Sequence, residues 1–203
     1  MTEIERVVTS GTFSLDGETF DVDNNVWLVG NGAQVAVVDP GHDAERILAA
    51  VGQREVVAIV CTHGHDDHIS AVGDLWDVTR APVWLHPADR MLWDVLYHDR
   101  APDRDLHEGA TISAGGVELR ILHTPGHSPG SSCLYVPDLD TLLSGDTLFQ
   151  GGPGATGRSF SDRPTIEQSI RERLLSLPAD TAVLTGHGDS TTIGEEAARP
   201  PFG

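Results

Sequence analysis

Short apolar runs separated by polar turns divide the chain into segments of strand length. The runs are rich in valine, isoleucine and leucine and are bounded by Gly, Pro, Asp or Asn, which is typical of β-strands. They span residues 26–29, 35–38, 56–61, 83–85, 117–122, 132–136, 141–143 and 182–184. Between some of them, apolar positions with helical spacing predict helices over residues 43–51, 69–78, 88–96 and 165–175.

The order of these elements predicts β-sheets covered by helices. Consecutive strands come first and strands mix with helices afterwards, which favours an α/β sandwich over a helix bundle or an all-β barrel. A chain of 203 residues is long enough to bury a sizeable core. Since no Pro/Gly/Ser-rich linker separates two halves, we expect residues 1–203 to form a single domain, with GGPGATG at 151–157 as a flexible loop inside it.

Charge and composition restrict the partners. The chain has 31 acidic residues and 13 basic ones, all arginines, for a formal net charge of -18. Nucleic acid is disfavoured as a partner because phosphate binding requires clustered Lys and Arg. With no signal-peptide pattern and no apolar run near the ~18 residues of a membrane span, we expect a cytoplasmic protein without membrane contact. Cys61 and Cys133 are expected to be buried thiols, and monomer and homodimer both stay open.

A polar cluster, THGHDDH at residues 62–68, directly follows the apolar run at 56–61. In a tight turn from strand to helix, His63 and His65 can project together, while Asp67 and His68 turn toward a neighbouring position. Imidazoles and carboxylates suit zinc, and also iron or manganese. On its own, the cluster fits a metal site and a helix-capping polar turn about equally well.

Three more candidate ligands follow predicted strands, each in a glycine-bounded turn. They are His127 in HTPGHSPGS, Asp146 in LLSGDTLF and His187 in VLTGHGDS. Strand ends at one edge of a layered protein converge on a crevice, and glycine beside a ligand lets the backbone pass close to a metal. Five histidines and two aspartates are enough for two divalent ions, about 3.5–4 Å apart, that share a hydroxide and polarise a carbonyl.

The motifs THGHDDH, TPGHSPGS, GDTLF and TGHGDSTTIGEE, in this order, resemble those of the metallo-β-lactamase superfamily. The resemblance implies an αβ/βα four-layer sandwich, in which two mixed β-sheets are flanked by helices and the metals lie at the edge between the sheets. It implies two divalent ions, with zinc expected and iron or manganese as alternatives. The implied ligands are His63, His65 and His127 for the first ion, Asp67, His68 and His187 for the second, and Asp146 as the bridge.

Two aspartates have further implied roles. Asp67 would orient the attacking hydroxide, which makes Asp67 and Asp146 the catalytic candidates. Asp39, in VVDPG at 37–41, matches the aspartate that supports the histidine loop from behind, since ligand histidines usually need an outer hydrogen-bond acceptor. A plain loop-capping role for Asp39 is the alternative.

The block GDTLFQGGPGATGRSF resembles that of glyoxalase II-type thioesterases, which hydrolyse S-acyl thiols such as S-lactoylglutathione. The resemblance implies a small-molecule thioester substrate, with Phe149, Arg158 and Phe160 near it, although an ordinary loop salt bridge is the alternative for Arg158. Asp146 stands where true β-lactamases usually have Cys or Ser, so antibiotic hydrolysis is not expected. The lysine-free composition resembles that of actinobacterial members of the family, whose carrier thiol would be mycothiol. S-acyl-mycothiol is therefore expected as a substrate besides S-acyl-glutathione.

Three other functions stay open. A persulfide dioxygenase would use the same scaffold with one iron held by His63, His127 and Asp146. A lactonase would also use two metals, but several lactonases have a tyrosine where this chain has Phe149. A structural or sensing metal module is a third alternative, although a closed zinc site requires only four ligands and this chain offers seven.

Overall fold

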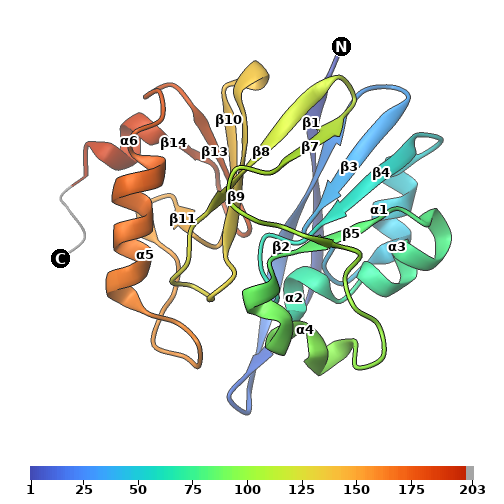
Figure 1. Cartoon of the computed structure of the whole chain (residues 1–203), viewed down its shortest axis with the longest axis horizontal. Coiled ribbons are helices and arrows are strands. Elements are labelled where there is room, and N and C mark those ends of the chain that lie inside the picture. Colours follow the sequence, from blue (N-terminus) through green and yellow to red (C-terminus); the bar gives the residue numbers. More distant parts are fainter. Residues whose placement is uncertain (200–203) are drawn as a thin grey trace.

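Two β-sheets stacked face to face form the centre of the molecule. The computed structural model describes residues 1–199, and Figure 1 shows helices on the outer side of each sheet. The N-terminal sheet consists, in spatial order, of β1 (Glu3–Leu15), β2 (Glu18–Gly30), β3 (Gln34–Val38), β4 (Glu55–Val60), β5 (Val83–Leu85) and β6 (Arg104–Asp105). The C-terminal sheet consists of β14 (Thr191–Thr192), β13 (Ala182–Thr185), β10 (Thr141–Gly145), β9 (Ser132–Val136), β8 (Val117–His123) and β7 (Thr111–Ala114).

The helices are short. Those that follow strands of the N-terminal sheet are α1 (Ala44–Val51), α2 (Asp66–Ile69), α3 (Val72–Thr79), the 3₁₀-helix η1 (Pro87–Asp89) and α4 (Arg90–Leu96). The remainder are the 3₁₀-helix η2 (Pro137–Leu139), α5 (Arg163–Ser169), its π-helical continuation η3 (Ile170–Leu174) and α6 (Ile193–Ala197). A small hairpin, β11 (Leu148–Phe149) with β12 (Gly152–Pro153), completes the described elements. Within residues 1–199, every helix is too short or too polar to span a bilayer.

Three apolar cores separate the layers, because the central strands bury both faces. Along β2, Val26 and Leu28 pack with α1 and α3, whereas Trp27 and Val29 pack between the two sheets. A third core joins the C-terminal sheet to α5 and η3 through Ile166, Ile170 and Leu174. Successive side chains of a strand point to opposite faces, so a strand covered on both sides is apolar throughout. The predicted αβ/βα four-layer sandwich is confirmed.

One edge of the sandwich collects the loops that carry the candidate ligands. In the N-terminal sheet β3, β4 and β5 are parallel, so their carboxyl ends lie together. In the C-terminal sheet β10 is parallel to β13, and β9 runs antiparallel to both β8 and β10. The loops after β4, β8, β10 and β13 therefore all leave the sheets at the edge where ligand sites form in layered α/β proteins.

The predicted strands all occur, but the helix predicted over residues 69–78 is wrong in its extent. The structure has two helices there, α2 and α3, separated at Ser70 and Ala71. The helix predicted over 165–175 begins two residues earlier, where Asp162 caps it by accepting from Thr165 N, and it continues as a π-helix. Part of the predicted loop at 151–157 pairs as β12. Residues 200–203 of the expected domain lie outside the described residues.

The long hairpin of β1 and β2 was not predicted. Its two strands pair from Glu3 with Gly30 to Leu15 with Glu18, and Figure 1 shows its tip extending past the body of the sheet, near α2 and α4. At the tip, Asp16 and Gly17 have φ angles of 56° and 78°, as in a type I′ turn. The dipeptide Asp-Gly is a strong signal for such a turn, so this hairpin was readable from the sequence.

Candidate metal centre

The loop after β4 carries four of the seven candidate ligands. His63, His65, Asp67 and His68 are all buried, although each is polar, and α2 begins directly after His65. Asp39 holds this loop from behind. Asp39 Oδ1 accepts from the backbone N of Thr62 at 2.7 Å, and its Oδ2 accepts from the Thr62 hydroxyl at 2.7 Å.

His63, His65 and His127 bring one ring nitrogen each to a single point. Nδ1 of His65 lies 3.0 Å from Nε2 of His63 and 3.0 Å from Nε2 of His127. His127 comes from the loop after β8 in the other sheet, so this group joins the two halves of the sandwich. Three converging imidazoles are the protein ligands of a catalytic metal site that keeps a position open for water or substrate.

Asp67, His68 and His187 form a second group beside the first. Nε2 of His68 lies 3.1 Å from Nε2 of His187, and Oδ2 of Asp67 lies 3.4 Å and 3.2 Å from the same two atoms. His187 follows β13, again from the other sheet. Both sheets therefore contribute to both groups.

Asp146 lies between the two groups and approaches members of each. Its Oδ1 lies 3.4 Å from Nε2 of His68, and its Oδ2 lies 3.5 Å from Nε2 of both His127 and His187. The backbone at Gly186 leaves room for this carboxylate, because a Cβ there would lie 2.2 Å from Asp146 Oδ1. Glycine next to a candidate ligand thus serves close approach, as the sequence indicated.

Backbone carbonyls orient two of the rings. Nδ1 of His127 lies 2.8 Å from the Ala155 carbonyl oxygen, and Nδ1 of His187 lies 2.7 Å from that of Asp23. A ring whose Nδ1–H donates to a carbonyl has its Nε2 lone pair free for a cation. In both cases Nε2 faces the centre of the cluster.

The chemistry of the cluster fits divalent cations. Asp146 Oδ1 is buried and has no hydrogen-bond partner among the described residues, and such an orphaned acceptor costs about 1–3 kcal/mol unless something neutralises it. Neutral imidazole nitrogens and carboxylate oxygens in groups of three are ligands that zinc, iron and manganese accept. Three such groups, which overlap at His63 and His68, lie within one cluster.

Burial and neighbouring charges shift the pKa values of these side chains in different directions. Burial, together with the neighbouring charge of His127, lowers the pKa of His65 to about 3. For His187 burial also acts to lower the pKa, but the charge of Asp146 outweighs it and raises the pKa to about 10. The pKa of His68 is raised in the same way, because the charges of Asp67 and Asp146 outweigh the effect of burial. Burial acts to raise the pKa of Asp67, yet His68 and His187 lower it to about 2.

These shifts predict proton release when metal binds. In the metal-free protein the raised pKa values of His68 and His187 favour the protonated ring at neutral pH, whereas the lowered pKa values of Asp67 and Asp146 keep both carboxylates ionised. Metal requires neutral imidazole, so we expect about two protons to leave these rings, besides the proton that metal-bound water loses, and the affinity to rise at least about 100-fold per pH unit near neutrality. Calorimetric zinc titrations in buffers of different ionisation enthalpy measure this number. Binding without proton release would contradict the assigned charges.

Sequence reasoning missed Asp89, which joins the two loops of the first group. Asp89 Oδ2 accepts from Gly64 N at 2.9 Å and from the Ser128 hydroxyl at 2.6 Å, and Oδ1 accepts from Gly130 N at 2.6 Å. Gly64 lies between two ligand histidines, and Ser128 follows His127. Asp89 is fully buried, and burial raises its pKa although these hydrogen bonds oppose the shift. It therefore positions the two loops that carry the candidate ligands of the first group.

Asn24 of β2 was also missed, and it supports Asp67. Its Nδ2 donates to Asp67 Oδ2 at 3.0 Å, and its Oδ1 lies 2.9 Å from Nε2 of His42. The His42 ring thus reaches the cluster through Asn24. The apolar run of β2 that follows gave no signal for this buried amide.

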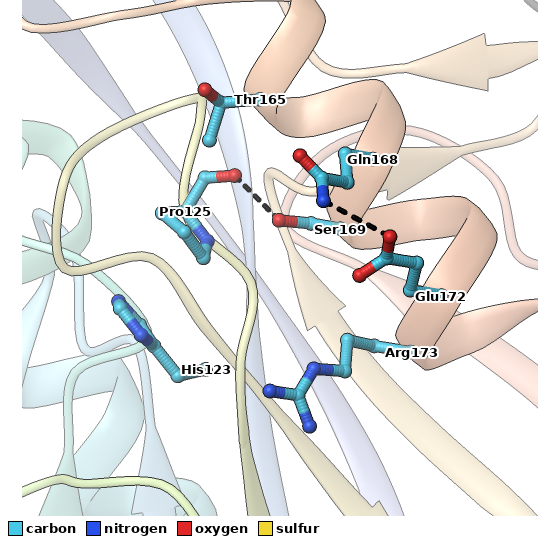
Figure 2. A pocket seen from close by; sticks show the side chains of 7 residues that line it. All are labelled: His123, Pro125, Thr165, Gln168, Ser169, Glu172 and Arg173. Atoms are coloured by element: carbon cyan, nitrogen blue, oxygen red, sulfur yellow. Dashed lines mark hydrogen bonds between the residues drawn. The ribbon is translucent and has the colours of Figure 1, made fainter.

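Helix α5 supports the His127 loop from the outer side. Ser169 and Pro125 both line a hollow of about 240 Å³. Figure 2 shows the Ser169 side chain pointing to the Pro125 carbonyl, and its hydroxyl donates to that oxygen at 2.8 Å. Gln168 and Glu172 pair on the same helical segment at 3.0 Å. The loop that bears His127 is thus held by Asp89 on one side and by α5 on the other.

The three residues expected near the substrate lie in different settings. Arg158 lines a hollow of about 50 Å³ together with His65 and His127, and it also forms the alternative salt bridge, 2.8 Å from Glu18. The Phe149 ring lies 6.3 Å from that of His187. Phe160 has 53% of its surface exposed, and its neighbours Ser159 and Ser161, not Phe160 itself, line the small hollow.

Comparisons with known proteins agree with this geometry. A profile of the metallo-beta-lactamase superfamily matches residues 19–187, which include all seven candidate ligands. The hydroxyacylglutathione hydrolase GloC of Haemophilus influenzae is 34% identical over 182 residues, covering 82% of this chain and 86% of that protein. The match therefore extends over most of both chains.

Two solved structures have the same architecture. BLEG-1, a B3 metallo-beta-lactamase, has a TM-score of 0.81 and 32% identity, covering 96% of this chain and 99% of its own. TTHA1623 in a di-iron-bound form has a TM-score of 0.78 and 36% identity, covering 89% of this chain and 96% of its own. The chain belongs to the metallo-beta-lactamase superfamily.

Proposed function

We propose that the protein is a binuclear metallohydrolase that cleaves thioesters of a low-molecular-weight thiol, such as glutathione or mycothiol. The observation that carries this proposal is the position of Asp146, whose two oxygens approach ring nitrogens of both ligand groups. A carboxylate so placed suits a bridge between two ions. Zinc is the expected metal, and the di-iron form of the relative TTHA1623 makes iron the first alternative.

Seven side chains would hold the metals and two would serve the reaction. When bound, two divalent ions supply a hydroxide at neutral pH and polarise the substrate carbonyl. Asp67, fixed by the hydrogen bond from Asn24, orients the attacking water and remains ionised at neutral pH. Water oxygen adds to the thioester carbon, the C–S bond breaks, and the sulfur leaves as a thiolate while the proton passes to solvent.

The leaving group favours thioesters over amides at this site. A thiol with a pKa near ~8.5 leaves as a thiolate without a dedicated general acid. The hollow of about 50 Å³ beside His65 and His127, with apolar walls from Phe13, Leu15 and Ala155, has room for roughly three to five atoms of water size. It therefore suits a short acyl group.

A metal assay followed by a substrate screen tests the proposal. We expect about two ions per chain and turnover of S-lactoyl or S-formyl thioesters of glutathione or mycothiol. Nitrocefin belongs in the screen because the relative BLEG-1 is described as a metallo-beta-lactamase, and a lactone panel tests the lactonase alternative. One iron per chain together with oxygen uptake on a persulfide would establish the dioxygenase alternative and exclude the hydrolase.

Arg158→Ala is expected to raise KM about two- to fivefold with kcat changed less than twofold. The guanidinium lines the hollow of about 50 Å³ beside His65 and His127, here named the acyl hollow, and it ties the hairpin tip to the loop after β12 through Glu18. An exposed ion pair of this kind contributes about 0.2–1 kcal/mol. Steady-state kinetics on the best thioester measure the split. Arg171→Ala, which loses an exposed helical pair with Glu167, is the matched control; equal KM values in both variants would remove Arg158 from the substrate site.

A further inference from the structure

A second, larger hollow opens beside the acyl hollow. It has a volume of about 360 Å³ and lies between the hairpin tip, the start of α2 and α4. We name it the tip groove; its lining residues are 14–19, 64–66, Leu92 and Val95. Both hollows share Leu15 and His65. A thioester with its carbonyl at the metal centre therefore has a small space for one half and a groove of ligand size for the other.

The hairpin tip is fixed as a wall of this groove from both sides. Both carboxylate oxygens of Asp66, in α2, accept from Ser14 N at 3.1 Å. On the opposite side Asp16 accepts from Ser159 N at 2.9 Å. The tip thus joins a helix of the N-terminal half to the loop after β12, and it lines the groove together with His65.

The groove is acidic, and its nearest arginine is already paired. Asp16, Glu18 and Asp66 lie along it. Among the described residues that line the two hollows, Arg158 is the one arginine, and its guanidinium contacts Glu18 at 2.8 Å and stacks over the Phe20 ring at 4.7 Å. Three carboxylates against one guanidinium give this lining a negative charge, the same sign as the formal net charge of -18. Two bound divalent ions would offset these charges only in part, so the groove repels an approaching anion.

We propose that the thiol carrier of the substrate occupies the tip groove and carries no net negative charge. Its hydroxyl or amide donors would face Asp16, Glu18 and Asp66, and its carbon skeleton would contact Leu15, Leu92 and Val95. This rests on the proposed thioester hydrolysis and narrows it: an uncharged, hydrogen-bond-donating thiol is favoured over glutathione or another anionic carrier.

A matched substrate pair tests the role of charge. S-lactoylglutathione carries a net negative charge, whereas the same thioester with its glycine carboxylate converted to a carboxamide carries none. We expect kcat/KM to be about three- to tenfold higher for the carboxamide, the size of a few screened charge contacts. Because salt screens exposed charges, the ratio should fall toward one at high ionic strength. Equal or better hydrolysis of S-lactoylglutathione at low salt would overturn the proposal.

Glu18→Gln locates the effect in the groove. The substitution removes one negative charge from the groove and leaves the Arg158 guanidinium without its carboxylate partner. The ratio of kcat/KM for the carboxamide to kcat/KM for S-lactoylglutathione should therefore fall to about two or less. Glu118→Gln changes the net charge equally but lies on β8 outside the lining of either hollow, and it should keep the full ratio. If both variants change this ratio equally, the preference arises from the overall charge of the protein, and the proposal that the carrier occupies the tip groove is overturned.

Binding of an uncleavable analogue separates this inference from the proposed reaction. S-propylglutathione and its carboxamide are thioethers, and calorimetry gives their Kd values without turnover. Tighter binding of the carboxamide, lost in Glu18→Gln, supports the groove even if no thioester is cleaved, in which case the proposed function alone fails. Turnover of both thioesters with equal Kd values for both thioethers would leave the reaction in place and overturn the carrier assignment.

Discussion

Asp146→Ala is expected to lower kcat/KM by at least about 10³-fold and to reduce bound metal from about two ions per chain to one or fewer. Its carboxylate approaches His68, His127 and His187, so its removal weakens both ligand groups together. A loss of several kcal/mol of stabilisation in the transition state corresponds to this factor. Elemental analysis and thioester kinetics on the same preparation measure both quantities.

The matched control for this prediction is Asp138→Ala. Asp138 lies exposed in η2, away from the cluster. The Asp138→Ala variant therefore also loses one carboxylate, but it should retain metal and activity. Asp146→Asn keeps the shape and one oxygen acceptor, and we expect it to retain more metal than the alanine variant. Full metal content with normal turnover in Asp146→Ala would contradict the bridging role.

The ligand candidates could be identified from the sequence because each of their loops follows an apolar strand and contains glycine. His127, Asp146 and His187 come from three separate loops, yet the strand directions of the C-terminal sheet bring these loops to one edge. The strands themselves were readable for the same reason, since strands buried on both faces are continuous apolar runs. Periodicity thus predicted both the layers and the edge at which polar residues collect.

Residues that act through other residues left no comparable signal. The partners of Asp89 lie 25, 39 and 41 positions away, and a buried aspartate that accepts from loop amides has no sequence period. The substrate side is similar. The GRSF segment indicated Arg158 and Phe160. The hairpin tip, which lines both hollows, was not predicted although its Asp-Gly turn was readable, so Glu18 was missed as the salt-bridge partner of Arg158.

Asp89→Asn is expected to weaken one of the two metal sites selectively. Asp89 holds Gly64, between His63 and His65, and the loop next to His127, so the variant loosens all three ligands of the first group. The second group keeps its own support through Asn24. Loss of an outer hydrogen-bond partner typically costs about 10–100-fold in metal affinity. A zinc titration with a competing chelator should therefore show one weakened site and one site of nearly unchanged affinity, whereas the unchanged protein binds zinc tightly at both sites.

Spectroscopy and stability distinguish this role from simple packing. Cobalt(II) at the first group should show a changed d–d spectrum in Asp89→Asn, while Asp94→Asn, on the exposed side of α4 and paired with Arg90, should leave it unchanged. Asp89→Ala would leave the buried amides of Gly64 and Gly130 without an acceptor, whereas the Ser128 hydroxyl keeps Ser131 Oγ at 2.8 Å. It is expected to lower the free energy of unfolding of the metal-free protein by about 2–6 kcal/mol. If Asp89→Asn weakens both metal sites equally, the carboxylate supports the fold as a whole and does not position the first group.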